Sequence, residues 1–272
     1  MLGEHETIYE SFCSRKRLVL FYRILVLPNL NQKKVGALIM KYEELPKAMQ
    51  EGAIKPYWDL LQKKKGSLIL KRLMDIVASF LMLVILSPFL LILAAAVKLD
   101  SKGPVFYRQV RVGRYNQDFK IFKFRTMVQN ADQIGPAVTT GEDPRITRVG
   151  KFIRRLRLDE FSQLLNVLNG TMSLVGPRPE VRKYVDLYTP EQMATLLVRP
   201  GVTAPSSIAF KDEDQLLDAA EDPEKVYAEQ ILPPKMKLNL EYLEHVSPLY
   251  DLSVLFQTVA AVFLPGGDKD AQ

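Results

Sequence analysis

The feature that most constrains this chain is an uncharged apolar stretch of 22 residues, Ile76–Val97. An unbroken helix rises about 1.5 Å per residue, so this length would cross a bilayer. The dipeptide Ser87-Pro88 divides the stretch into 11 residues before it and 9 after it. Each half would then be about 14–16 Å long, roughly one leaflet. The stretch therefore predicts a re-entrant membrane helix-break-helix.

The residues around this break favour the same prediction. Pro88 lacks a backbone N–H and its ring clashes with the preceding turn, while the Ser87 hydroxyl would satisfy a carbonyl that the break frees. Both ends of the stretch are basic, which gives a spanning helix no orientation but suits a hairpin that returns to the cytoplasm. A proline-kinked helix that spans the bilayer is the alternative. The basic residues are Lys63, Lys64, Lys65, Lys71 and Arg72 before the stretch, and Lys98, Lys102 and Arg108 after it.

Three charged residues stand at the entrance of the apolar stretch: Lys71, Arg72 and Asp75. Their spacing places Asp75 on the same helix face as both basic residues, at i,i+4 and i,i+3. We interpret them as a structural clasp, a local salt bridge at the end of the membrane segment.

A second feature is the segment Arg145–Pro179, in which an acidic pair follows a group of basic residues. Asp159 and Glu160 precede an apolar helical stripe that ends at Gly170, so they fall at a helix N-terminus. Free N–H groups and the helix dipole favour anions there. We expect a carboxylate inside a ring of arginines to stay ionised at neutral pH and to share its space with bound phosphate. The basic residues are Arg145, Arg148, Lys151, Arg154, Arg155 and Arg157.

Two prolines flank Arg178 in the turn 176–179 (GPRP). They fix φ on both sides, so a stiff backbone presents a guanidinium suited to bidentate contact with phosphate or carboxylate. A plainer interpretation of the whole segment is that Asp159 caps a helix, Glu160 is a first-turn acid and the arginines form a solvated face.

A β-hairpin is predicted by two strand-like runs, Pro104–Val112 and Asp118–Met127, which flank a glycine-containing turn. Alternation in the second run places Lys123 and Arg125 on the face opposite two phenylalanines. The alternation by itself indicates an amphipathic strand whose basic residues are solvated.

The remaining chain adds weaker signals. Helical spacing in 148–158 and 249–264 predicts two amphipathic helices, each interfacial or packed on a core. Within residues 1–66, the apolar run Leu18–Leu27 is too short and interrupted for a membrane span. The single Cys13 forms no internal disulfide and fits a reducing compartment. A net charge of +6 suits nucleic acid, anionic lipid or a phosphorylated substrate.

These motifs resemble the bacterial sugar transferase family, the monotopic polyprenyl-phosphate phosphoglycosyl transferases. The resemblance covers about Leu68–Leu264 and is carried by 158–160 (LDE), 166–173 (NVLNGTMS) and 176–179 (GPRP). It implies an α+β, mostly helical fold with a re-entrant membrane helix-break-helix, interfacial amphipathic helices and a small β-hairpin. The expected domains are an N-terminal extension of unknown role (1–66), a re-entrant membrane hairpin (67–103) and a cytoplasmic catalytic domain (104–272).

The activity that the resemblance implies is transfer of a sugar 1-phosphate from a UDP-sugar to polyprenyl (undecaprenyl) phosphate, with release of UMP. Asp159 would be the nucleophile that forms a covalent phosphosugar intermediate. Glu160 would act on the acceptor phosphate, and both carboxylates would hold Mg²⁺, which neutralises the pyrophosphate. Phosphate oxygens would be bound by Arg154, Arg178, and Lys123 or Arg125.

The resemblance also implies a location and partners. We expect the chain at the cytoplasmic face of the bacterial inner membrane, in contact with membrane lipids, where it would initiate a capsule, O-antigen, exopolysaccharide or glycoprotein. A homodimer is left open. After the family-like turn 199–203 (RPGVT), the sequence departs from the family pattern with 204–217 (APSSIAFKDEDQLL), so the sugar contacts usual there, for which Lys211 is the nearest basic residue, are not assigned.

Two rival functions use the same features. A membrane-anchored nucleic-acid binder would need the basic residues, but the sequence has no DNA-reading helix motif and no aromatic stacking platform, so no nucleic-acid partner is expected. A non-catalytic membrane scaffold would explain the hairpin and the amphipathic helices but not an acidic pair among arginines.

Overall fold

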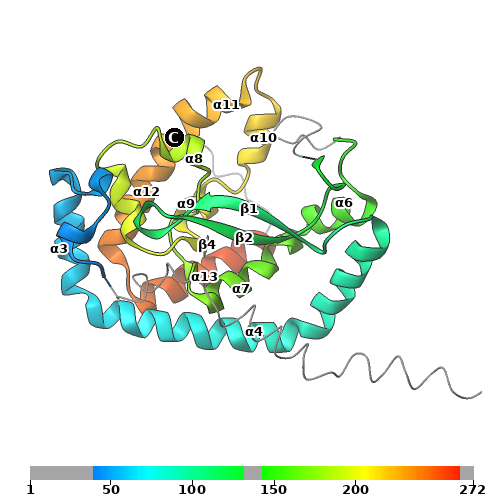
Figure 1. Cartoon of the computed structure of the whole chain (residues 1–272), viewed down its shortest axis with the longest axis horizontal. Helices are drawn as coiled ribbons and strands as arrows, with labels where there is room; N and C mark the ends of the chain where they lie inside the picture. The colour runs from blue at the N-terminus through cyan, green and yellow to red at the C-terminus, as the bar shows by residue number, and fades with distance from the viewer. Residues whose placement is uncertain (1–38, 132–142, 264–272) are drawn as a thin grey trace, which may run out of the picture.

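A computed structural model describes residues 39–131 and 143–263. Cys13 and Leu18–Leu27 lie outside this range. The described part is mostly helical with two small two-stranded sheets, which confirms the mostly helical α+β class (Figure 1). It begins with three short 3-10 turns and a helix, packed together at one end of the molecule: η2 (Tyr42–Glu44), η3 (Lys47–Met49), η4 (Gly52–Ile54) and α3 (Lys55–Lys63).

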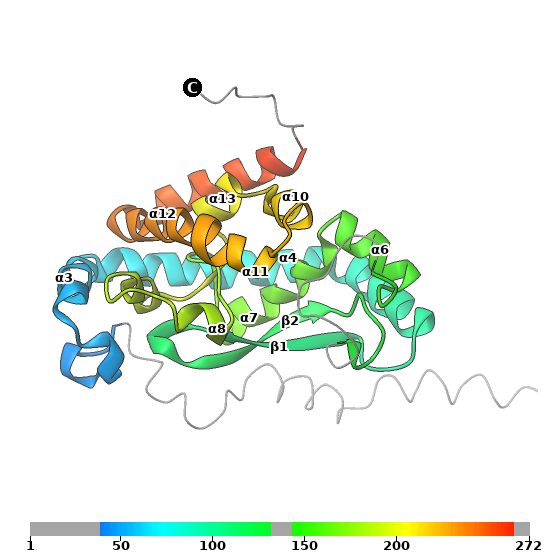
Figure 2. The same cartoon turned by 90° about the horizontal axis from the view of Figure 1, so that it is seen from above.

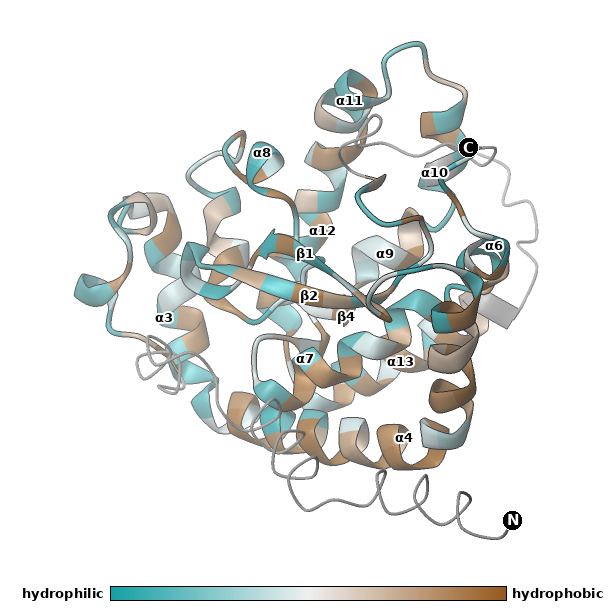
Figure 3. Cartoon of the chain, turned by 45° about the vertical axis from the view of Figure 1, so that its right-hand side comes forward, coloured by the Kyte–Doolittle hydropathy of each residue, from teal (hydrophilic) through white to brown (hydrophobic). Residues whose placement is uncertain are grey.

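The long apolar helix is α4, Lys65–Asp100, which has 36 residues and contains Pro88. It runs along one edge of the molecule and bends toward α6 in its second half (Figures 1 and 3). Ser87 Oγ donates to the carbonyl of Val84 at 2.8 Å. In a regular helix this carbonyl would accept a hydrogen bond from the N–H of residue 88, which proline lacks. The expected compensation by the Ser87 hydroxyl is therefore confirmed.

Helix α4 is polar where it is buried and apolar where it is exposed. Its buried residues in the first half are Lys71, Asp75 and Ser79, one turn apart on a single face. Its outward side chains, such as Ile85 at 74% and Leu91 at 70%, are open. In the described part of the chain, α4 alone is long and apolar enough to cross a membrane, and only 11% of its most apolar window is buried. Lipid contact accounts for this arrangement, because a helix in a water-soluble core shows the reverse.

Both ends of α4 pack on the same folded unit. The first half contacts α7 (Leu164–Asn169), β3 (Ser173–Val175) and α13 (Pro248–Phe263). The second half buries Leu93 and Val97 in a small apolar cluster with Phe124 and Ile153, from the hairpin and α6 (Arg148–Arg155). The bend in α4 therefore brings both ends of the helix into contact with the same folded unit.

The predicted β-hairpin is confirmed. Strand β1 (Phe106–Val112) pairs antiparallel with β2 (Asp118–Phe124), in a register that runs from Phe106 opposite Phe124 to Val112 opposite Asp118. The turn η5 (Arg114–Asn116) joins them. Figure 2 shows this hairpin on one side of the molecule and α12 (Leu232–His245) with α13 on the other.

The main core joins distant parts of the chain. Met49 and Ile54 from the N-terminal segment are fully buried in the same cluster as Val167 of α7 and Leu243 of α12. Residues 39–66 therefore pack on the folded unit, and the three-domain division stays a prediction. The C-terminal part adds α8 (Arg182–Val185), η7 (Gln192–Leu197), β4 (Gly201–Thr203), α9 (Pro205–Ala209), α10 (Glu213–Asp218), α11 (Pro223–Val226) and a π-helical turn, η8 (Tyr227–Ile231).

The two predicted amphipathic helices are both present, and each packs one face while exposing apolar side chains on the other. In α6, Ile153 is fully buried, whereas Phe152 is 48% exposed. In α13, Val254 is buried, whereas Phe256 is 75% exposed. The first helix ends at Arg155, earlier than expected, and Arg157 then takes the left-handed conformation at φ 52°.

Candidate active site

The acidic pair stands at the start of a helical segment, as predicted. Asp159 and Glu160 lie in the first turn of a 3-10 helix, η6 (Leu158–Gln163), which continues into α7. Gly170 ends α7 in the left-handed conformation at φ 87°, which confirms the predicted stop. The first turn is 3-10 where a single α-helix was expected, since the chain enters it directly from the left-handed Arg157.

Glu160 is held by two cations. Its Oε1 accepts a hydrogen bond from Arg178 Nη2 at 2.6 Å and one from Lys123 Nζ at 3.4 Å. Burial alone would raise the pKa of Glu160, but the charges of Arg178 and Lys123 outweigh it and hold the pKa at about 2. Glu160 is therefore ionised across the physiological range.

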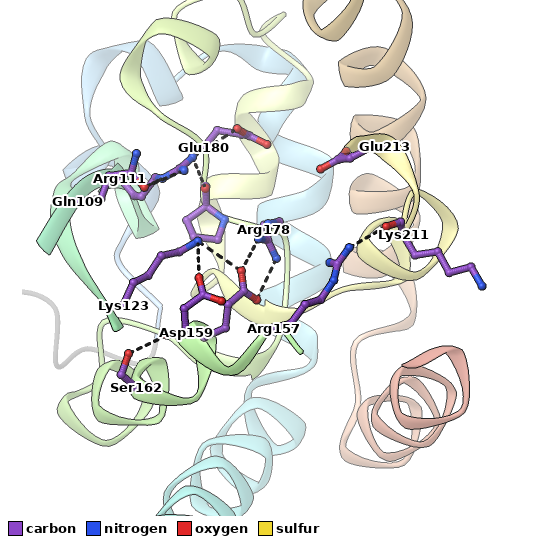
Figure 4. A network of polar contacts seen from close by, with 12 residues as sticks. Gln109, Arg111, Lys123, Arg157, Asp159, Ser162, Arg178, Glu180, Lys211 and Glu213 are labelled. Atoms are coloured by element: carbon purple, nitrogen blue, oxygen red, sulfur yellow. Dashed lines mark hydrogen bonds and ion pairs between the residues drawn. The ribbon is translucent and has the colours of Figure 1, made fainter. Parts of the chain in front are cut away.

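Asp159 is held less tightly. Lys123 Nζ lies 3.7 Å from its Oδ2, beyond hydrogen-bonding distance, and the side chain is 17% exposed. Burial raises the pKa of Asp159; Lys123 opposes this shift and the neighbouring Glu160 adds to it. The two adjacent carboxylates therefore differ, since Glu160 is locked in an ion pair with Arg178, whereas Asp159 is partly exposed and has a raised pKa. Figure 4 shows Asp159 beside Lys123.

The expected ring of arginines around Asp159 is wrong in its membership. Arg145 is buried and bonds Asp143, and the exposed Arg157 donates to the carbonyl of Lys211 at 2.8 Å. Arg154 donates to Thr126 Oγ1 at 3.0 Å, and its charge lowers the pKa of Asp159 only slightly against burial. The others point to solvent because α6 turns its polar face outward: Arg148, Lys151 and Arg155.

Of the two basic residues predicted on β2, the structure brings only Lys123 to the carboxylates. The guanidinium of Arg125, which follows β2, is buried and donates to the carbonyls of Ser101 at 2.7 Å and Lys102 at 2.9 Å. Those carbonyls lie just beyond the end of α4, so Arg125 fastens the membrane segment to the hairpin. The alternation of residues in the strand did not reveal this contact, because the position of the end of α4 relative to the hairpin depends on tertiary packing.

Arg178 is positioned by two closely apposed turns. Strands β3 and β4 pair in parallel, and Gly176, which follows β3, lies against Gly201, the first residue of β4. A Cβ on Gly201 would meet the backbone nitrogen of Gly176 at 2.2 Å, so both turns require glycine at this contact. The Pro179 carbonyl accepts from Arg111 Nη1 at 3.4 Å. The stiff presentation expected from the flanking prolines is thus reinforced by a second turn.

The clasp at the start of α4 is larger than predicted. Lys71 Nζ lies 3.8 Å from Asp75 Oδ1 and also forms an ion pair with Asp251 of α13. Asp75 accepts from Ser173 Oγ at 2.7 Å and from the Leu174 amide at 3.1 Å. Arg72 donates to the carbonyls of Leu168 at 3.3 Å and Met172 at 3.4 Å, near the end of α7. The lone acid in the apolar helix 249–264 was the signal that could have revealed Asp251.

Sequence reasoning missed a second polar network beside Arg178. Tyr227 donates to Glu180, and Lys235 contacts the Tyr227 hydroxyl at 3.5 Å. Lys235 also forms an ion pair with Glu213. Glu180 in turn lies 3.9 Å from Arg111. These residues come from four segments spread over about half the chain, so no local pattern announced them.

The carboxylate pair gives limited support for a metal. Across residues 39–131 and 143–263, no group of three or more His, Cys, Asp or Glu side chains is placed to hold one. Mg²⁺ needs fewer protein ligands, because it is commonly bound by one or two carboxylates with substrate phosphates and water. Asp159 and Glu160 meet that minimum, with Asp159 the better ligand because Glu160 is engaged by Arg178. The Mg²⁺ site stays a prediction.

Fold and site together define a membrane-associated α+β protein with a partly exposed carboxylate beside a lysine and an arginine. Residues 66–265 match the model of the family described as "Bacterial sugar transferase", and the chain belongs to that family. A UDP-N-acetylgalactosamine-undecaprenyl-phosphate N-acetylgalactosaminephosphotransferase of Aeromonas hydrophila is 39% identical over 74% of this chain and 45% of its own length. A UDP-glucose:undecaprenyl-phosphate glucose-1-phosphate transferase of Klebsiella pneumoniae is 38% identical over 73% of this chain and 41% of its own length.

A shorter relative matches almost from end to end. An exopolysaccharide production protein of Rhizobium leguminosarum is 38% identical over 73% of this chain and 98% of its own length. By contrast, the chain spans less than half the length of the Aeromonas and Klebsiella proteins.

Proposed function

We propose that this chain transfers a sugar 1-phosphate from a UDP-sugar to undecaprenyl phosphate, releases UMP and initiates synthesis of a surface polysaccharide. The observation that carries the proposal is the unequal acidic pair, in which Glu160 is fixed by Arg178 while Asp159 stays accessible beside Lys123. The printed activities of the Aeromonas and Klebsiella relatives support the same chemistry.

In the first half-reaction, an oxygen of Asp159 attacks the β-phosphorus of the nucleotide sugar. The bond from that phosphorus to the bridging oxygen breaks, so UMP leaves and an aspartyl phosphosugar remains. Lys123 and Arg178 lie where they would stabilise charge on the transferring phosphoryl group, and Arg154 adds a more distant positive charge. The raised pKa of Asp159 suits a nucleophile because basicity and nucleophilicity rise together.

In the second half-reaction, a phosphate oxygen of the lipid attacks the same phosphorus and frees the Asp159 carboxylate. With a pKa of about 2, Glu160 is a poor proton acceptor near neutral pH, which favours a role in positioning Arg178 and Lys123. Mg²⁺ held by Asp159 and the substrate phosphates would neutralise pyrophosphate charge.

We further propose that α4 enters and leaves the membrane on the cytoplasmic side. Its first half bonds β3 and α13. In its last turn, the Val97 carbonyl accepts from Arg125, which follows β2, at 3.4 Å, and Asp100 accepts from the Val149 amide of α6 at 3.0 Å. A spanning helix would place its two ends on opposite sides of the hydrocarbon core, whereas contact of both halves of α4 with one folded unit supports a re-entrant helix. Basic residues at both ends support the cytoplasmic side.

The decisive test of the chemistry uses purified chain with a panel of UDP-sugars and no lipid acceptor. We expect release of about one equivalent of UMP and a mass increase of one sugar phosphate on the peptide that contains Asp159. Glu160→Gln should slow both adduct formation and turnover, because Glu160 positions Arg178 and Lys123 for both half-reactions. UMP release that occurs only after lipid is added, with no adduct trapped, would support direct displacement and reduce Asp159 to a metal ligand.

The topology is tested with single cysteines at positions 65 and 102 in a Cys13→Ser background. Both should resist a membrane-impermeant thiol reagent applied from the periplasmic side. Labelling of either one would show a spanning helix. Pro88→Leu should restore the backbone donor that proline lacks, straighten the bent helix α4 and shift the protein toward spanning.

A further inference from the structure

A further carboxylate, that of Glu213, lies near the cations of the proposed phosphate site, where another negative charge does not help to bind phosphate. Glu213 begins α10 and its side chain points toward Arg178 (Figure 4). The pKa of Arg178 is raised, mainly by Glu160 and further by Glu213 and Glu180. Since Glu160 already neutralises Arg178 at 2.6 Å, a further carboxylate can only weaken the attraction for a phosphate.

Glu213 is fixed in this position by a buried lysine. Lys235 is 3% exposed and forms an ion pair with Glu213, whose side chain keeps 22% exposure. Lys235 also lies 5.0 Å over the ring of Tyr227, whose hydroxyl donates to Glu180. Burial of a lysine is costly unless a partner offsets it, so this arrangement is a built support and not a surface contact.

The carboxylate retains capacity for a ligand. Lys235 bonds its Oε2, and no described residue donates to Oε1. An ionised carboxylate only accepts hydrogen bonds, so it suits neutral donors such as hydroxyl groups and repels phosphate. A nucleotide sugar presents hydroxyls beside its phosphates, on both the sugar and the ribose. Glu213 also lies in 204–217, the stretch in which the sequence leaves the family pattern.

We infer that Glu213 accepts hydrogen bonds from hydroxyls of the nucleotide sugar, that Lys235 and Tyr227 position it, and that it helps to determine donor specificity. The inference rests on the proposed function and deepens it. It assigns a recognition role to residues outside the catalytic pair and outside the family motifs.

Glu213→Gln separates this role from a purely electrostatic one because the two predict opposite signs. Loss of hydroxyl recognition should raise the KM for the UDP-sugar about 10- to 100-fold, with a much smaller change in kcat. Inhibition by inorganic pyrophosphate, which has no hydroxyls of this kind, should be unchanged or stronger. If Glu213 only tunes charge, both ligands should bind more tightly, and that result would overturn the inference.

Binding of UDP and 2′-deoxy-UDP identifies which hydroxyls are read. A ribose contact predicts that Glu213→Gln weakens UDP but leaves 2′-deoxy-UDP unaffected. A contact with the transferred sugar predicts that UDP is unaffected and only the complete UDP-sugar is weakened. Either pattern supports the inference, whereas equal affinities of wild type and variant for every ligand would remove it.

The matched control is Glu224→Gln, an exposed carboxylate that pairs with Lys183 on α8. It should change neither KM nor kcat, and thermal unfolding of both variants should match the wild type. Wild-type UMP release is measured in parallel. No release with any UDP-sugar would defeat the proposed function, whereas release with an unchanged KM in Glu213→Gln defeats only this inference.

Discussion

Two clusters of charged residues in this molecule each place one lysine between two carboxylates, but they have different roles. One cluster holds the fold together, and the other forms the candidate active site. In the clasp, Lys71 lies between Asp75 and Asp251; in the candidate active site, Lys123 lies between Asp159 and Glu160. Both use the same three functional groups. The two clusters differ in how completely the hydrogen-bonding atoms of their charged side chains have partners.

The clasp is closed. Asp251 is fully buried and accepts from the Tyr242 hydroxyl at 2.9 Å as well as pairing with Lys71, which also donates to the Val175 carbonyl at 2.9 Å. In the site, Asp159 stays partly exposed, and the nearest part of Lys123, its Nζ, lies 3.7 Å from the Asp159 carboxylate. A buried cluster of charges whose hydrogen bonds are all formed stabilises one arrangement of the chain. A carboxylate with fewer hydrogen bonds is available for reaction.

The largest contrast is expected at the acids. Asp159→Asn should lower turnover by about 10⁴-fold or more and abolish the covalent adduct, because an amide is a poor nucleophile. Its melting temperature should stay near that of the wild type. Asp118→Asn, which alters an exposed acid paired with Arg182, is the activity control. An active, adduct-forming Asp159→Asn would contradict the catalytic assignment.

Substitution of the two lysines tests whether the two clusters contribute differently to the stability of the fold. Lys71→Met leaves Asp75 and Asp251 buried together without their cation, so it should destabilise the fold by about 3–5 kcal/mol. Lys123→Met should reduce activity with little loss of stability, since water reaches its partners. Thermal and denaturant unfolding in detergent measures both variants. Equal destabilisation by the two substitutions would show that the groups do not differ as described.

Arg178→Lys tests the bidentate contact. A lysine cannot reproduce the planar fork, so kcat/KM should fall about 10- to 100-fold. Arg182→Lys, on the adjacent α8, is the matched control because Arg182 bonds only the hairpin residues Asn116 and Asp118 in the described structure. Full activity of Arg178→Lys would remove the forked contact from the mechanism.

The smallest effect concerns pH. Asp159 must be ionised to attack, and burial raises its pKa above the usual 3.8, so the acid limb of adduct formation should lie above pH 3.8. Glu160, with a pKa of about 2, stays ionised throughout that range. Lys123 lowers the pKa of Asp159, so Lys123→Met should move the acid limb to higher pH. Single-turnover rates between pH 4 and 8 measure the shift, and a limb that moves to lower pH would refute it.

Local sequence carried much of the fold. The spacing of apolar residues located α4, the hairpin, α6 and α13. Pro88 indicated a departure from a straight helix, but α4 continues through it and bends where a break was predicted. The approach of Gly176 to Gly201 was not predicted, because a close contact of two turns leaves no period in the sequence. Basic residues in α6 were overvalued for the same reason: helix orientation decides which of them face Asp159.

The sequence by itself determined which chemistry is available: an apolar helix that contains a proline, an acidic pair at a helix start, and an arginine between prolines. These depend on short-range sterics and periodicity, which neighbouring residues fix. Only the tertiary structure decided that Lys123 and not Arg125 meets the acids, that Asp251 completes the clasp, and that Glu213 is held by Lys235. Such pairings join residues 22 to 180 positions apart, and packing of the whole chain alone brings them within bonding distance.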